Sequence, residues 1–145
     1  MSPPRSAGDD AATASATREE PLSRPDAPPA ILAVDDELDF LATYRRMFSR
    51  HGFRVVTVSS RAAALDALAH ERFALVIIDL RLPDGDGLEI VREAQAMSPP
   101  TPAVVVSGYV SGTAHRDALV AGAAAVFTKP FDSAALAARV RELAR

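Results

Sequence analysis

One stretch organises the rest of this chain: Leu75-Val76-Ile77-Ile78-Asp79-Leu80-Arg81-Leu82-Pro83-Asp84-Gly85-Asp86-Gly87. Its first four residues are apolar and a Pro/Gly/Asp cluster follows, which predicts a short strand, buried on both faces, that ends in a turn. Asp79 then stands at the carboxyl end of the strand, the edge where open α/β sheets place their ligands. Taken alone, such an aspartate more often begins a turn or caps a helix. Its role therefore has to be judged from the other strand ends.

The composition indicates one domain with neither nucleic-acid nor membrane character. The 145 residues are 48% hydrophobic and 24% charged, which is enough for one packed core. The formal net charge of −3 argues against direct nucleic-acid binding, and the absence of cysteine excludes disulfides and thiolate sites. No apolar run approaches the ~20 residues of a membrane span, and the N-terminus lacks a signal-peptide pattern. We therefore expect a cytoplasmic protein.

The first 29 residues differ from the remainder of the chain. They contain six of the eleven prolines, and Leu22 is their only large apolar residue after Met1. So few apolar side chains cannot offset the entropy lost on folding. We expect a disordered Pro/Ala/Ser-rich tail over residues 1–29 and one folded domain over residues 30–145.

From Ala30 onward, apolar runs alternate five times with helical patterns. Strands are expected at Ile31–Val34, Arg54–Val58, Leu75–Ile78, Ala103–Val106 and Ala125–Thr128. Helices are expected at about 37–50, around 64–68, at about 87–97 and 113–121, and after a cap at Asp132 or Ser133. The second strand is partly polar, as is typical of an edge. The alternation predicts a doubly wound α/β fold, with a five-stranded parallel sheet and helices on both faces.

Polar side chains follow four of these strands: Asp35 and Asp36 the first, Asp79 the third, Ser107 the fourth and Lys129 the fifth. Because the carboxyl ends of parallel strands share one edge of the sheet, we expect these side chains to converge. Clustered carboxylates repel one another, but a set of oxygen ligands suits Mg²⁺. Together with a hydroxyl and an ammonium group, such a metal site fits phosphoryl transfer to a nucleophilic carboxylate.

Lys129 is the only lysine among sixteen basic residues, the others being arginine. A single lysine can arise by chance. Its place at a strand end nevertheless favours a specific use of its compact ammonium group, which a planar guanidinium does not reproduce.

These motifs, in this order, resemble the receiver domain of bacterial two-component response regulators. They are Asp35-Asp36, Ile77-Ile78-Asp79-Leu80, Leu82-Pro83 with Asp86-Gly87, Ser107, and Lys129-Pro130-Phe131. The resemblance covers about residues 30–145 and implies a flavodoxin-like sheet with strand order 2-1-3-4-5. It also implies a cis peptide bond between Lys129 and Pro130.

The same resemblance implies a role for each site residue. Asp79 is the phosphoacceptor and a metal ligand, and Ser107 and Lys129 hold phosphoryl oxygens. Asp36 binds Mg²⁺ directly and Asp35 binds it through water. The backbone carbonyl of Arg81 completes the protein ligands.

The implied function is signal transduction. A sensor histidine kinase or a histidine phosphotransfer protein would phosphorylate Asp79, and the chain would then bind an unknown downstream protein or pass the phosphoryl group along a phosphorelay. The resemblance implies catalysis only of this transfer and of slow autodephosphorylation, so we do not expect an enzyme with a separate substrate. We expect a single-domain regulator that contacts neither nucleic acid nor membrane directly.

One position departs from the family pattern. The family usually has an aromatic residue three positions before the lysine, where this chain has Val126. We therefore expect the conformational response to run through the loop from Ser107 to Thr113, with Tyr109 as the aromatic that rearranges.

Two alternatives remain open at this point. Phosphatases of the haloacid dehalogenase type also use an aspartyl phosphate, Mg²⁺, a hydroxyl and a lysine. Their nucleophile belongs to an Asp-x-Asp motif on the first strand, where this chain has Asp35-Asp36-Glu37. The second alternative is a receiver-like binding module that is never phosphorylated.

Overall fold

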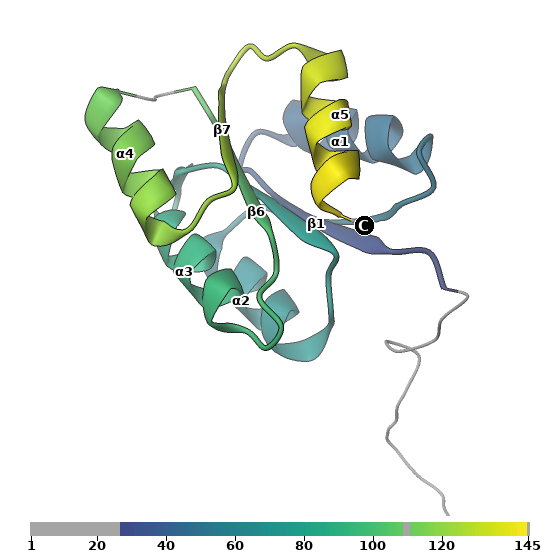
Figure 1. The fold of residues 1–145 in the computed structure, drawn as a ribbon, viewed down its shortest axis with the longest axis horizontal. Helices are drawn as coiled ribbons and strands as arrows, with labels where there is room; N and C mark the ends of the chain where they lie inside the picture. Colours follow the sequence, from purple (N-terminus) through teal and green to yellow (C-terminus); the bar gives the residue numbers. More distant parts are fainter. Residues whose placement is uncertain (1–26, 109–110, 145) are drawn as a thin grey trace, which may run out of the picture.

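Five parallel strands form the central sheet of the computed structural model, which describes residues 27–108 and 111–144 (Figure 1). The strands are β1 (Ala30–Val34), β2 (Arg54–Val58), β3 (Leu75–Ile78), β6 (Ala103–Ser107) and β7 (Ala125–Thr128). Their spatial order is β2-β1-β3-β6-β7, and every neighbouring pair is parallel. This order confirms the predicted fold class and places β2 at an edge.

The three inner strands are apolar because both of their faces are covered. Every residue of β1, β3 and β6 is buried. Side chains alternate between the two faces, so Leu32 and Val34 enter one core cluster while Ile31 and Ala33 enter the other. Continuous apolar runs of this kind are typical of a parallel strand between two helical layers.

Two helical layers cover the sheet (Figure 1). The helices α1 (Leu38–Ser49) and α5 (Ser133–Leu143) lie on one face, and α2 (Arg61–His70), α3 (Leu88–Ala96) and α4 (Gly112–Ala121) lie on the other. None of the helices in residues 27–108 and 111–144 is long and apolar enough to cross a membrane.

Local capping sets where the helices begin and end. Asp132, one of the two predicted caps, starts α5, because its carboxylate accepts hydrogen bonds from the amides of Ala134 and Ala135. Gly122 ends α4 in the left-handed conformation, at φ 116°. These signals are local, which is why the sequence places these two ends within a residue.

The segment after Asp79 is more ordered than the predicted turn. It forms a short antiparallel hairpin of β4 (Arg81–Leu82) and β5 (Gly85–Asp86), in which Arg81 pairs with Asp86 and Leu82 with Gly85. Pro83 and Asp84 make its tip. The predicted turn is therefore present at the tip, and two residues on each side of it also pair with each other.

Two predictions concern residues outside the described ranges. The expected disordered tail lies there except for residues 27–29, and so does Tyr109.

Val126 is half-buried against the cluster under α2, α3 and α4, while Phe127 packs against the opposite cluster. Phe127 thus lies on the face of the sheet expected from strand alternation.

Candidate functional site

The carboxyl edge of the sheet brings three aspartates together. Asp35 and Asp36 follow β1 and Asp79 follows β3, and the Asp79 amide donates a hydrogen bond to the Val34 carbonyl at 3.0 Å. One carboxylate oxygen from each aspartate lies within 4.8 Å of the other two. The predicted convergence of these residues is therefore present.

Asp79 is held by three donors from different parts of the chain. Ser107, at the end of β6, donates its hydroxyl hydrogen to Asp79 Oδ1 at 2.9 Å. The backbone amide of Arg81 donates to the same oxygen at 3.2 Å. Lys129 Nζ donates to Oδ2 at 3.0 Å. Both carboxylate oxygens are thus oriented, and only 6% of the residue is exposed.

Lys129 makes more contacts than the strand-end argument anticipated. Its Nζ lies 2.7 Å from Asp35 Oδ2 and 2.9 Å from Glu37 Oε1, in addition to its bond with Asp79. The same atom lies 4.1 Å from the centroid of the Phe40 ring. Burial by itself lowers the pKa of Lys129, but its hydrogen bonds with the three carboxylates outweigh burial and hold the pKa above its usual value. The ammonium is therefore charged at physiological pH.

Glu37 and Phe40 are the residues of this site that the sequence did not reveal. Glu37 entered the sequence argument only within the Asp35-Asp36-Glu37 run, and Phe40 only as part of the helix expected at about 37–50. A usable signal exists, because positions i and i+3 at the start of a helix lie on the same face. That face turns toward Lys129, 92 residues away from Glu37.

The two aspartates after β1 have different surroundings. Asp35 is buried, at 1% exposure, and its Oδ1 accepts a hydrogen bond from the Glu37 amide at 2.9 Å. Asp36 is exposed. The exposed carboxylate suits a ligand that enters from solvent, whereas Asp35 is already paired with Lys129.

Burial raises the pKa of Asp35 to about 6, against the opposing effects of Lys129 and the Glu37 amide. The folded state then holds a proton more tightly than the unfolded chain, whose pKa lies near the ordinary value of 3.8. The contribution of the protonated Asp35 carboxyl to the free energy of unfolding is fully present below pH ~4 and is lost as the pH rises through ~6. In chelator, we expect thermal melts of wild type to lose stability over this range, relative to Asp35→Asn, by on the order of 1 kcal/mol. Parallel pH profiles of the two proteins would contradict this prediction.

The donor set fits a hard divalent cation. All three side chains offer oxygen, with neither nitrogen nor sulfur among them, and their oxygens are close enough to share one ion. Arg81 follows Asp79 by two residues, and the hydrogen bond that its amide donates to Asp79 Oδ1 places its backbone beside the carboxylate. The metal roles of Asp35, Asp36, Asp79 and the Arg81 carbonyl stay predictions.

Gly87 makes room for Asp79 at the start of α3. A Cβ atom at this position would lie 2.2 Å from the Asp79 carbonyl oxygen and 2.9 Å from Ile78 Cγ2. The Gly87 amide donates to the Leu80 carbonyl at 2.9 Å, so the backbone passes closely over the end of β3. The sequence showed two glycines near Asp79 but did not indicate which of them is sterically required.

Tyr44 lies in the aromatic cluster of the α1 and α5 layer. Its ring stacks on Phe131 with centroids 5.9 Å apart, and its buried hydroxyl has no hydrogen-bond partner among the described residues. Burial, reinforced by Asp35 and Asp79, raises the pKa of Tyr44 far above its usual value. The phenol therefore stays neutral and cannot serve as a base.

The Lys129–Pro130 peptide bond is cis, as the resemblance implied, and Ser98–Pro99 is also cis. The second was not expected.

Comparison with known sequences gives a consistent picture. The family model described as "Response regulator receiver domain" matches residues 31–141. The Mycobacterium tuberculosis protein "Transcriptional regulatory protein PrrA" is 36% identical over 117 residues, which cover 81% of this chain and 50% of the relative. "Transcriptional regulatory protein ZraR" of Klebsiella oxytoca is 29% identical over 102 residues, covering 70% of this chain and 23% of the relative. The chain thus spans half or less of the length of these two curated relatives.

Solved structures match the fold over nearly their whole length. A CheY-like response regulator receiver domain protein from Methanospirillum hungatei JF-1 has a TM-score of 0.76 at 28% identity, covering 81% of this chain and 94% of that one. The BeF3-activated N-terminal receiver domain of Klebsiella pneumoniae RstA has a TM-score of 0.74 at 27% identity, covering 80% and 98%.

Proposed function

The chain belongs to the response regulator receiver domain family, and we propose that Asp79 accepts a phosphoryl group from a phosphohistidine donor in a Mg²⁺-dependent reaction. The observation that carries this proposal is the arrangement of hydrogen-bond donors around the Asp79 carboxylate. One oxygen of Asp79 accepts from Ser107 and the other accepts from Lys129, so hydroxyl and ammonium donors flank the carboxylate. These are the groups that a transferred phosphoryl group needs as partners.

The transfer forms one bond and breaks one. An Asp79 carboxylate oxygen attacks phosphorus, the P–N bond of the donor breaks, and the electron pair of that bond leaves on the imidazole nitrogen. Ser107 and Lys129 then donate their hydrogen bonds to phosphoryl oxygens in place of the carboxylate. Asp36, Asp79 and the Arg81 carbonyl would hold Mg²⁺ directly and Asp35 would hold it through water, and the ion would offset the negative charge of the phosphoryl group.

The charge of the carboxylate cluster supports this metal requirement. A phosphoryl donor is anionic, and three carboxylates lie at the place where it must approach. Lys129 offsets part of this charge through its contacts with Asp35 and Asp79. A divalent cation held by these carboxylates would offset the remainder.

Partners follow from the family. We propose that a sensor histidine kinase or a histidine phosphotransfer protein supplies the phosphoryl group, and that an unknown protein or a phosphorelay step receives the signal. The chain itself catalyses only its own phosphoryl transfer and slow autodephosphorylation. Its net charge of −3 supports action through protein partners rather than through DNA contacts of its own.

The dehalogenase-type alternative has less support. Its nucleophile would be an aspartate after β1, whereas the Ser107 hydroxyl and the Lys129 ammonium both donate to Asp79, which follows β3. The second alternative, a binding module that is never phosphorylated, does not account for three aspartates, a hydroxyl and an ammonium meeting at one edge of the sheet.

The test is labelling by acetyl phosphate, a small phosphoryl donor, followed by intact mass and peptide mapping. We expect labelled wild type in Mg²⁺, no label in chelator, and the label on the peptide that contains Asp79. Asp36→Asn should require far more Mg²⁺, because it removes an exposed metal ligand, while the matched Asp39→Asn change in α1 should behave as wild type. Full labelling in chelator, label on another residue, or steady turnover of the donor through Asp35 would each contradict the proposal.

A further inference from the structure

Asp84, at the tip of the β4–β5 hairpin, is bonded to the first turn of α2. Its Oδ1 accepts from the Arg61 amide at 2.7 Å, and its Oδ2 accepts from the Ala62 amide at 2.9 Å. The first amides of a helix have no partners within the helix. Asp84 therefore supplies a cap for α2 from a segment more than twenty residues further along the chain.

The Arg61 side chain extends this contact over the hairpin. Its Nε donates to the Asp84 carbonyl at 3.3 Å, and its Nη1 forms an ion pair with Glu89 in α3. A Cβ atom on Gly85 would lie 2.5 Å from Arg61 Nε, so only glycine permits the guanidinium to lie this close. We call Arg61, Asp84, Gly85 and Glu89 the α2 clasp.

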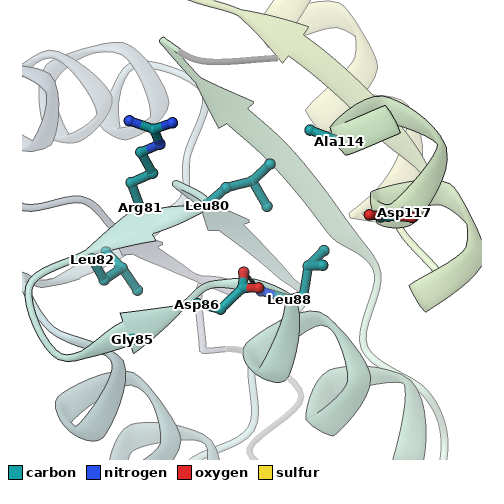
Figure 2. A pocket seen from close by; sticks show the side chains of 8 residues that line it. All are labelled: Leu80, Arg81, Leu82, Gly85, Asp86, Leu88, Ala114 and Asp117. Atoms are coloured by element: carbon teal, nitrogen blue, oxygen red, sulfur yellow. Dashed lines mark hydrogen bonds between the residues drawn. The ribbon is translucent and has the colours of Figure 1, made fainter. Parts of the chain in front are cut away.

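The opposite side of the hairpin is open. A cavity of about 500 Å³ separates it from α4, with Leu82 and Asp86 on the hairpin side and Ala114 and Asp117 on the α4 side (Figure 2). Packing against α4 therefore does not hold the hairpin at this cavity. The α2 clasp restrains it from the other side.

The hairpin leads directly to the site. Arg81 pairs with Asp86 across the hairpin, and its amide donates to Asp79 Oδ1. A displacement of the tip is transmitted through this two-residue ladder to the Arg81 backbone.

We propose that Asp84 and Arg61 are positioning residues for the metal site, which hold the Arg81 backbone in register with Asp79 through the β4–β5 hairpin. The proposal rests on the proposed function of that site. The backbone amides of Ala62 and Arg61 also hold the pKa of Asp84 below its usual value, so its carboxylate is charged while it caps α2. The clasp lies outside the residues that touch the reacting groups, and its effect is on geometry.

The test compares Asp84→Ala with Ser60→Ala in the full chain. Ser60 caps the same helix end, because its Oγ accepts from the Ala63 amide at 3.1 Å, but among the described residues it makes no hydrogen bond with the hairpin. Both changes weaken α2, and only Asp84→Ala releases the hairpin. Mg²⁺ titrations followed by calorimetry should show roughly tenfold weaker binding for Asp84→Ala, the lower end of the usual cost of losing an outer partner of a metal ligand. Ser60→Ala should stay within about twofold of wild type.

A second readout needs no metal. In chelator, hydrogen exchange at the amides of Arg81 and Gly87 should be faster in Asp84→Ala than in Ser60→Ala, whereas a purely structural cap predicts equal rates. Asp84→Asn, whose amide oxygen still accepts one bond, should fall between Asp84→Ala and wild type. Equal exchange in the two alanine variants overturns the proposal, whatever their Mg²⁺ affinity. Wild type that binds no Mg²⁺ overturns the proposed function instead, and the exchange comparison still decides the role of the clasp.

Discussion

Asp79→Asn is expected to abolish labelling by acetyl phosphate completely, in Mg²⁺ as well as in chelator. The amide oxygen of asparagine can still accept the hydrogen bond from Ser107, so this contact with the side chain at position 79 is retained. An amide oxygen, however, is not a nucleophile for phosphorus. We do not expect Asp35 or Asp36 to replace it, because the hydroxyl of Ser107 and the ammonium of Lys129 converge on the side chain at position 79. Intact mass after incubation with the donor gives the result directly.

The matched control is Asp66→Asn, the same chemical change on the exposed surface of α2. It should label as wild type does. A label on Asp79→Asn, or a loss of label in Asp66→Asn, would mean that the reaction does not depend specifically on the Asp79 carboxylate. A thermal melt of Asp79→Asn checks that the loss of label comes from chemistry and not from unfolding.

Gly87→Ala is expected to have the largest effect on stability of any conservative change near the site. The added Cβ would lie 2.2 Å from the Asp79 carbonyl oxygen, a backbone atom that cannot move aside as a flexible side chain does. Gly87 has φ −63°, a conformation that alanine accepts, so the expected cost is steric. Forced overpacking costs about 1–3 kcal/mol, and we expect a loss near the upper end, measured by denaturant unfolding. Labelling of Asp79 should also fall, because the same clash displaces the end of β3.

Gly112→Ala is the control for this change. Gly112 also stands at the start of a helix, and nothing lies within 4 Å of the Cβ that alanine would add. Since alanine forms helix better than glycine by about 1 kcal/mol, this variant should equal or exceed wild type in stability. If Gly87→Ala proves as stable as Gly112→Ala, the close approach at Asp79 is not a constraint.

The sequence was informative wherever the determinant is local or follows from topology. An apolar run between turn residues locates each inner strand, and Asp132 and Gly122 mark helix ends through their own hydrogen bonds or backbone conformation. Parallel strands present their carboxyl ends at one edge, so the strand ends alone predicted the meeting of Asp79 with Ser107 and Lys129. No side-chain packing had to be known for that prediction.

Tertiary structure alone decided how these groups are surrounded. The burial of Asp35 and the exposure of Asp36 depend on how the loop after β1 packs. The contacts of Glu37 and Phe40 with Lys129 depend on the rotation of α1 about its axis. Asp84 and Gly87 depend on tertiary structure in the same way. Asp84 caps a helix that begins more than twenty residues earlier in the chain, and Gly87 is required only because the end of β3 passes beneath it. Contacts between distant segments depend on the packing of whole elements to within an ångström. A one-dimensional pattern of apolar and polar residues specifies which face of an element is buried, but not its position to that accuracy.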